Sequence, residues 1–187
     1  MGKLGFYFDM RYCISCKACL MACKDRNNLW EGQYFRRVFD FDDGEGAHAN
    51  GSPRLRNYSG ACNHCAKPAC IPVCPVGAIR ADDDGIVIIN RETCIGCGKC
   101  VKSCPYKAIM IKKPRAPAAK CDACGELRRQ GKNPACVDAC IARCLHFGSL
   151  GDFEKKYGPG LVRKIPVLPD PAITEPSLLI RRARENG

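Results

Sequence analysis

The chain has 187 residues, of which 30 are Lys or Arg, 19 are Asp or Glu and 17 are Cys, and its formal net charge is +11. So high a cysteine content restricts a chain of this length to disulfide-rich secreted proteins or to metal-binding proteins. The odd number of cysteines, the lack of a twin-arginine or apolar signal segment before the first of them, and their repeated spacing argue against disulfides. No stretch approaches the roughly 18 consecutive apolar residues of a membrane span, so none is expected.

A short strand is predicted at residues 4–8, and it leads directly into the first of four cysteine motifs. This motif has the spacing C-x2-C-x2-C-x3-C, with which bacterial ferredoxins bind a cubane 4Fe–4S cluster. Its cysteines are Cys13, Cys16, Cys19 and Cys23. Residues 24–56 carry aromatic side chains between glycines and acidic residues, and we expect an insertion with some strand character there.

The second and third motifs predict a compact two-cluster ferredoxin domain over residues 57–113. Their cysteines are Cys62, Cys65, Cys70 and Cys74, then Cys94, Cys97, Cys100 and Cys104. Each motif ends in Cys-Pro, and residues 82–85 predict a turn before a strand at residues 86–89. In such ferredoxins the fourth cysteine of a motif ligates the other cluster. We therefore expect cluster 3 on Cys62, Cys65, Cys70 and Cys104, and cluster 4 on Cys94, Cys97, Cys100 and Cys74.

The fourth motif has the cysteines Cys121, Cys124, Cys136 and Cys140. Like the first motif it lacks the trailing proline, and these two motifs are left once the inner pair is made. Pairing them gives cluster 1 on Cys13, Cys16, Cys19 and Cys140, and cluster 2 on Cys121, Cys124, Cys136 and Cys23. Pairing of neighbouring motifs, the first with the second and the third with the fourth, stays open as an alternative.

The predicted fold is α+β, with two ferredoxin-like domains, one inserted in the other, each binding two 4Fe–4S clusters, and with loop-rich extensions. The outer domain comprises residues 1–56 and 114–147, and its insertion spans residues 24–56. The inner domain comprises residues 57–113. Residues 148–187 are expected to form an extended C-terminal tail that drapes over a neighbouring subunit, with helix only at residues 177–184.

Two other interpretations of the composition fit less well. Zinc sites also use C-x2-C pairs, but the first and third motifs each have three evenly spaced cysteines and a fourth after x3, which favours iron–sulfur clusters. A positive net charge is typical of proteins that bind nucleic acids. Each cluster with its thiolates carries about −2, however, so four clusters reduce the net charge from +11 to about +3 in the loaded protein. We therefore expect no nucleic-acid binding.

Two side chains in or near the motifs could be mistaken for additional ligands. His64 lies inside the second motif, whose thiolate positions are already filled, so we expect a hydrogen bond near the cluster rather than ligation. Cys144 is outside the four motifs and is expected to be a small buried hydrophobic residue, although ligation stays open. No catalytic constellation appears, so the chain is not expected to be an enzyme on its own.

The sequence closely resembles the iron–sulfur subunit of the dimethyl sulfoxide reductase family of molybdopterin enzymes. The segments that carry the resemblance are residues 5–9, 19–25, 35–37, 62–65, 84–87, 94–97, 104–106, 120–122, 131–134, 136–137, 147–148 and 168–169, with Thr174 and Pro176. The resemblance implies one-electron transfer through four clusters in the order 1, 2, 3, 4. Lysines near the motifs are expected to tune the cluster potentials, namely Lys17, Lys99, Lys107 and Lys120.

The resemblance also implies partners. Cluster 1 would face a molybdopterin-containing catalytic subunit, and cluster 4 a membrane-anchor subunit that handles a quinol. The chain would then be membrane-associated through a partner, on the cytoplasmic face or exported with a signal-bearing partner, because it shows no signal peptide of its own. The alternatives are the equivalent subunit of a formate dehydrogenase, hydrogenase or tungsten oxidoreductase, and a free polyferredoxin.

Overall fold

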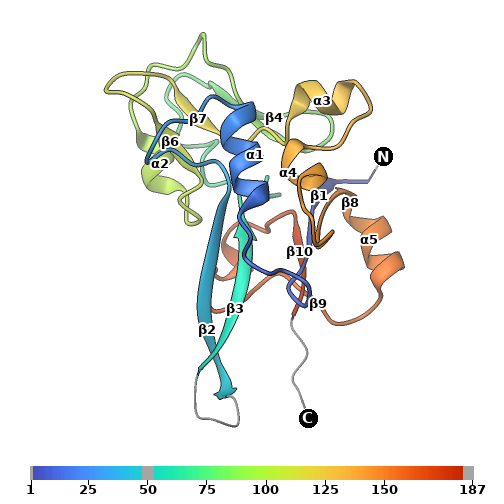
Figure 1. The fold of residues 1–187 in the computed structure, drawn as a ribbon. Coiled ribbons are helices and arrows are strands. Elements are labelled where there is room, and N and C mark those ends of the chain that lie inside the picture. Colours follow the sequence, from blue (N-terminus) through green and yellow to red (C-terminus); the bar gives the residue numbers. More distant parts are fainter. Residues whose placement is uncertain (1, 48–52, 183–187) are drawn as a thin grey trace.

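The computed structural model describes residues 2–47 and 53–182, and Figure 1 shows their arrangement. Parts of the expected insertion (residues 48–52) and of the expected tail (residues 183–187) lie outside the described residues. The helices are α1 Ala18–Arg26, α2 Lys99–Ser103, α3 Gly125–Arg129, α4 Ala135–Asp138 and α5 Leu150–Tyr157, with the 3-10 helix η1 Pro171–Ile173. The strands are β1 Leu4–Asp9, β2 Arg37–Ala47, β3 Pro53–Gly60, β4 Ile79–Ala81, β5 Val87–Ile89, β6 Ile109–Ile111, β7 Ala118–Lys120, β8 Leu145–Ser149, β9 Leu161–Val162 and β10 Leu178–Arg181.

A four-stranded sheet with the order β8-β1-β10-β9 joins the two ends of the described chain. The predicted strand at residues 4–8 is confirmed as β1, which pairs antiparallel with β8 and parallel with β10. β1 is buried on both faces: Phe6 and Phe8 belong to the main apolar core, and Tyr7 packs against α5 with its ring 4.0 Å from that of Tyr157. An interior strand covered on both faces explains its nearly continuous apolar sequence.

The C-terminal segment differs from the expectation in two ways. The helix expected at residues 177–184 is wrong, because the described part of this segment forms strand β10, with Leu178 and Ile180 buried against β1. The segment is also not extended throughout, because β10 packs on this chain's own sheet and residues 150–157 form α5. Ser149 caps this helix by accepting a hydrogen bond from the Asp152 amide. Pairing with the otherwise free edge of β1 stabilises a strand here more than the weak helical pattern of these residues favours a helix.

Three two-stranded hairpins complete the fold. The strand character expected in the insertion is confirmed by β2 and β3, which form a long arm that extends from the body in Figure 1. The strand expected at residues 86–89 is confirmed as β5, which pairs with β4 across the predicted turn. In that turn the Asp82 carboxylate accepts the amides of Asp84 and Ile86, and Gly85 has a φ of +76°. β6 and β7 form the third hairpin.

The buried apolar residues form separate clusters, and cysteines are prominent in two of them. The main core, between the sheet, α1 and the β2–β3 arm, includes Cys19, Cys23, Cys121, Cys136 and Cys140. A second core lies among β4 to β7 and α2, at the other end of the molecule in Figure 1. None of the described helices combines the length and the apolar character needed to cross a membrane. These elements thus bury or half-bury fifteen of the seventeen cysteines.

Candidate iron–sulfur centres

All four motifs share one backbone feature in their first C-x2-C step. The residue directly before the second cysteine has a positive φ in every motif, at Ser15 (55°), His64 (42°), Gly96 (66°) and Ala123 (55°). Non-glycine residues rarely adopt this conformation, and its recurrence at equivalent positions marks a local requirement of the motif. Such a turn directs successive amide groups toward an anion. In the fourth motif, the Ala123 amide donates to Cys121 Sγ at 3.3 Å.

A second turn follows the last cysteine of three motifs. The third residue after it has a positive φ at Gly77 (61°), Lys107 (50°) and Arg143 (49°). In two motifs the next amide donates back to the cysteine sulfur, from Ala78 to Cys74 at 3.2 Å and from Ala108 to Cys104 at 3.4 Å. Amide donors to sulfur stabilise a thiolate ligand, so these loops suit metal-bound rather than free cysteines.

Two small cavities each collect cysteines from two motifs. One is lined by Cys62, Cys65, Cys70 and Cys104, which are the four cysteines expected for cluster 3. The other is lined by the four expected for cluster 1, Cys13, Cys16, Cys19 and Cys140, and also by Cys144. Within the described residues, no three His, Cys, Asp or Glu side chains are arranged to hold a single metal ion. Four sulfurs around a shared space fit a cubane, which has one iron for each thiolate.

The remaining eight cysteines also lie near the others of their expected sets. For cluster 2, helices α1 and α4 pack together, and Cys23 interacts electrostatically with Cys136 and Cys124. Burial raises the pKa of Cys23 to about 12, which the charge of Arg36 opposes. For cluster 4, Cys74, Cys94 and Cys100 share one apolar core. Buried thiols with raised pKa values keep their protons at neutral pH unless a positively charged group takes the place of those protons. An iron–sulfur core is such a group.

Cys144 lies against a cysteine of the cluster 1 set. Its side chain is 3% exposed and its Sγ is 3.5 Å from Cys140 Sγ. The sequence predicted a buried residue here, and burial is confirmed. That the thiol faces the cavity of cluster 1 was not visible from the sequence, because Cys144 belongs to no motif.

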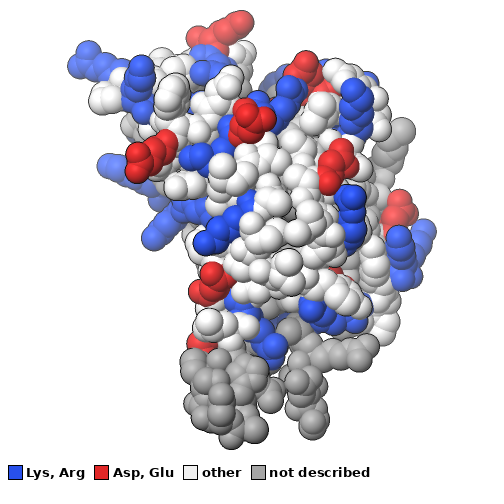
Figure 2. Space-filling view, viewed as in Figure 1, with Lys and Arg blue, Asp and Glu red and all other residues white. Residues whose placement is uncertain are grey.

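Charged groups near the cysteines were only partly predicted. Figure 2 shows Lys and Arg side chains over much of the visible surface, with fewer Asp and Glu between them. Of the four lysines expected to tune potentials, Lys120 is buried and the other three are exposed. The Lys120 ammonium donates to the carbonyl oxygens of Val87 and Cys121, the latter at 2.8 Å. His64 is fully buried, with Nδ1 4.0 Å from Cys62 Sγ.

The second buried cation among the described residues, Arg36, was not singled out from the sequence as a functional residue. It precedes strand β2, and its Nη1 donates to the carbonyl oxygen and to Oγ of Ser59 at 3.0 and 3.1 Å. Ser59 Oγ is in turn 3.3 Å from Cys19 Sγ. Burial lowers the pKa of Arg36, but attraction to Cys136 and Cys121 in their thiolate form outweighs this effect and holds the pKa above its ordinary value.

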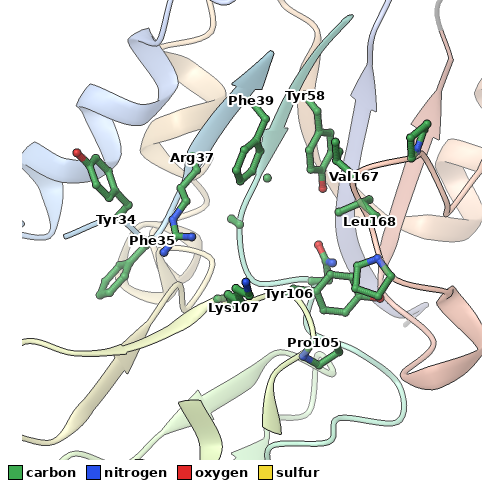
Figure 3. Close-up of a pocket in the computed structure, with 16 residues that line it drawn as sticks. Tyr34, Phe35, Arg37, Phe39, Tyr58, Pro105, Tyr106, Lys107, Val167 and Leu168 are labelled. Atoms are coloured by element: carbon green, nitrogen blue, oxygen red, sulfur yellow. The ribbon is translucent and has the colours of Figure 1, made fainter. Parts of the chain in front are cut away.

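A larger hollow of about 580 Å³ lies beside the loop that follows Cys104, and no cysteine lines it. Figure 3 shows Phe39 and Tyr58 from adjacent strands of the arm, with Tyr106 and Leu168 near one another across from them. The hollow lies at the surface between the arm, this loop and residues 166–169. It adjoins the cavity of cluster 3, with which it shares the lining residues Asn63, Pro105, Tyr106 and Ala108.

The cysteine-lined cavities, the amide donors to sulfur and the repeated turns define a ferredoxin-type iron–sulfur protein. Comparison with known families agrees: a 4Fe-4S dicluster domain matches residues 55–150, and a second 4Fe-4S dicluster domain matches residues 12–78. Both matches include the second motif. The predicted α+β fold with two ferredoxin-type domains is confirmed at this level, and the boundaries of an inner and an outer domain stay a prediction.

Individual relatives identify the family more closely. The sequence is 40% identical to the B subunit of anaerobic dimethyl sulfoxide reductase from Haemophilus influenzae, over 97% of this protein and 90% of that one. It is 36% identical to the B subunit of the same reductase from Escherichia coli, over 96% and 88%. The B subunit of polysulfide reductase from Wolinella succinogenes is 31% identical, over 99% and 97%. This protein therefore belongs to the family of iron–sulfur B subunits of such reductases, as its resemblance had indicated. It is an electron-transfer subunit and not itself a catalytic one.

Proposed function

We propose that this chain relays electrons one at a time through four 4Fe–4S clusters, between a quinol-handling membrane subunit and a molybdopterin-containing catalytic subunit. The ligands would be the sixteen cysteines in the four sets defined above, clusters 1 to 4. When bound, each cluster supplies a one-electron couple without any bond-making by the protein. The chain's own residues bind the clusters, exclude water from them and set their electrostatic surroundings.

The exposure of the cysteines carries this proposal. All seventeen cysteines are described, and among them Cys16 and Cys97 are exposed while the others are buried or half-buried. These two belong to the cluster 1 and cluster 4 sets, the proposed ends of the relay. A series of cofactors that is open at both ends and covered between them suits transfer between two partners.

Interactions between cysteines of successive sets support the order of the relay. Cys19 of the cluster 1 set interacts electrostatically with Cys136 of the cluster 2 set. Cys121 of the cluster 2 set interacts with Cys62 of the cluster 3 set. Cysteines of the cluster 3 and cluster 4 sets, including Cys70 and Cys94, share the second apolar core. Each proposed cluster thus has its proposed neighbours beside it.

Exposed apolar side chains beside both ends support docking of partners there. Tyr12, Ile14 and Ile141 are 58%, 65% and 67% exposed and adjoin cysteines of the cluster 1 set in sequence. Ile95 is 58% exposed and lies between Cys94 and Cys97 of the cluster 4 set. Large apolar residues gathered at a functional end are typical of interaction sites. The catalytic subunit would cover the first group and the membrane subunit the second, which would hold the chain at the membrane.

Anaerobic affinity purification from the native cells tests this proposal. We expect a complex with a large subunit that contains molybdopterin, together with about sixteen iron atoms for each copy of this chain. Metal analysis and absorption across the visible range accompany the identification of the copurified subunits. A brown protein that arrives alone would favour a free polyferredoxin, tungsten in place of molybdenum would favour another partner enzyme, and a colourless zinc protein would contradict the proposal.

A further inference from the structure

Arg36 is a buried cation whose hydrogen bonds are incomplete. Its side chain is among the largest fully buried ones, and the residue is 2% exposed. Nη1 has its two acceptors on Ser59, whereas Nε and Nη2 are buried and have no hydrogen-bond partner among the described residues. The guanidinium carbon lies 4.7 Å from the centre of the Phe6 ring, which does not replace a counter-ion. A buried charge is strongly destabilising unless an opposite charge compensates for it.

The surroundings of Arg36 contain cysteines of two neighbouring sets. Through Ser59 Oγ its side chain connects to Cys19 Sγ, which belongs to the cluster 1 set. Because Nη1 donates to Ser59 Oγ, the Ser59 hydroxyl proton is free to point at the Cys19 sulfur. The backbone of Arg36 makes a hydrogen bond to Cys23, which belongs to the cluster 2 set, and its charge interacts with Cys121 and Cys136 of the same set.

We infer that the Arg36 guanidinium is the shared counter-charge of clusters 1 and 2 and that it raises the reduction potentials of both. This inference rests on the proposed function, because it requires clusters on these cysteine sets. The N–H groups on Nε and Nη2, which have no partner among the described residues, are the donors that remain for anionic sulfur. Ser59 extends the same effect to cluster 1 through its hydrogen bond to Cys19.

The physical reason lies in how reduction changes charge. Each one-electron reduction adds a negative charge to a group that already carries about −2, and a nearby buried cation stabilises the reduced form more than the oxidised form. Because an arginine does not lose its proton in proteins, this contribution stays constant with pH. A cation close to two clusters acts on both potentials in the same direction, so it raises both without itself creating a large difference between them.

Redox titration of the loaded complex, followed by electron paramagnetic resonance, tests the inference. The variants are Arg36→Met, which removes the charge at similar length, Arg36→Lys, which keeps it, and Ser59→Ala. Arg37→Met is the matched control, because the neighbouring Arg37 is only half-buried and is not among the largest charge effects on Cys19 and Cys23. The expected effect of Arg36→Met is an about tenfold lower ratio of reduced to oxidised form at a fixed potential for two of the four clusters, which is about 59 mV for a one-electron couple.

The variants separate a role in tuning from a role in folding. We expect Arg36→Lys to recover most of the shift, Ser59→Ala to lower the potential of cluster 1 alone, and Arg37→Met to change none. Unshifted potentials in Arg36→Met with full iron content overturn the inference. If that variant is recovered without iron, Ser59→Ala decides, and an unchanged cluster 1 potential there overturns it. A wild-type complex without four cluster signals would instead overturn the proposed function itself.

Discussion

Replacement of Cys140 tests whether the first and fourth motifs share their clusters. Cys140 lies 127 positions after Cys13 in the sequence, yet both line one cavity with Cys16 and Cys19. Cys144 lines the same cavity, with its sulfur 3.5 Å from that of Cys140. The distance is short enough for Cys144 to replace the missing thiolate by a change of rotamer. We therefore expect Cys140→Ser alone to keep cluster 1 and the double variant with Cys144→Ala to lose it.

The size of the effect follows from the number of ligands. A chain with four cubanes holds about sixteen iron atoms, so the double variant should retain about twelve and lose about a quarter of its visible absorbance. Cys144→Ala alone should keep all the iron, because it leaves the four expected ligands in place. Iron and labile sulfide are measured on anaerobically purified protein, and electron paramagnetic resonance identifies the signal that is lost.

Comparison with Cys124→Ser gives the outcome that would refute the reasoning. Cys124 belongs to the cluster 2 set, so its replacement should remove a different signal from that lost in the Cys140 and Cys144 double variant. The same signal lost in both would mean that the fourth motif keeps all its cysteines on one cluster, which contradicts the exchange between motifs. Loss of four iron atoms in Cys140→Ser alone would show that Cys144 cannot act as a substitute ligand.

Three further predictions concern buried side chains. Lys120→Met should lower the potentials of clusters 2 and 3 by tens of millivolts (about the charge effect of one nearby cation), and redox titration would show unshifted values if Lys120 is only structural. Ile180→Ala should cost about 2–5 kcal/mol, seen as an earlier loss of visible absorbance in guanidinium, whereas Ile173→Ala at an exposed site (58%) should not. Burial raises the pKa of Asp9, but hydrogen bonds from Arg11 and Tyr7 hold it below its ordinary value. The Asp9 carboxylate therefore stabilises the fold above about pH 4, and this stabilisation is lost as the pH falls through the lowered pKa. Asp9→Asn should remove the contribution of Asp9 to the pH dependence of the free energy of unfolding, which acid titration of unfolding would show.

Cysteine spacing predicted the class of cofactor and the electron-transfer role, because cubane ligation requires a fixed local geometry. The family followed instead from the resemblance of segments within and beyond the motifs. The rule that the fourth cysteine of a motif ligates the other cluster predicted sets of cysteines that the structure brings together. An example is Cys104, which lines one cavity with the cysteines Cys62, Cys65 and Cys70 of the second motif. Strands at the start of the chain and after the Asp82 turn were predicted equally well, since local turn chemistry and apolar runs determine them.

What the sequence did not reveal depends on contacts between distant segments. Arg36 looks like one basic residue among 30, and only the fold shows that it is buried among cysteines of two sets. The last described strand was missed for a similar reason, because its apolar residues fit either a helix or a strand. Pairing with β1, which only the fold shows, makes this segment a strand. The position of Cys144 beside Cys140 likewise follows from the turn at Arg143, whose conformation only the structure shows.

The C-terminal segment has a consequence for how the protein is made. The Ser177 amide and hydroxyl donate to the carbonyls of Asn63 and His64, and the Ala66 amide donates to the Glu175 carbonyl, so this segment fastens the loop of the second motif. Synthesis proceeds from the N-terminus, and all four motifs precede this segment. The hydrogen bonds from this segment to the second motif can therefore form only after all four motifs have been synthesised. A chain truncated before Glu175 would lack these contacts, so the loop that carries the cysteines of the second motif would lose the segment that fastens it.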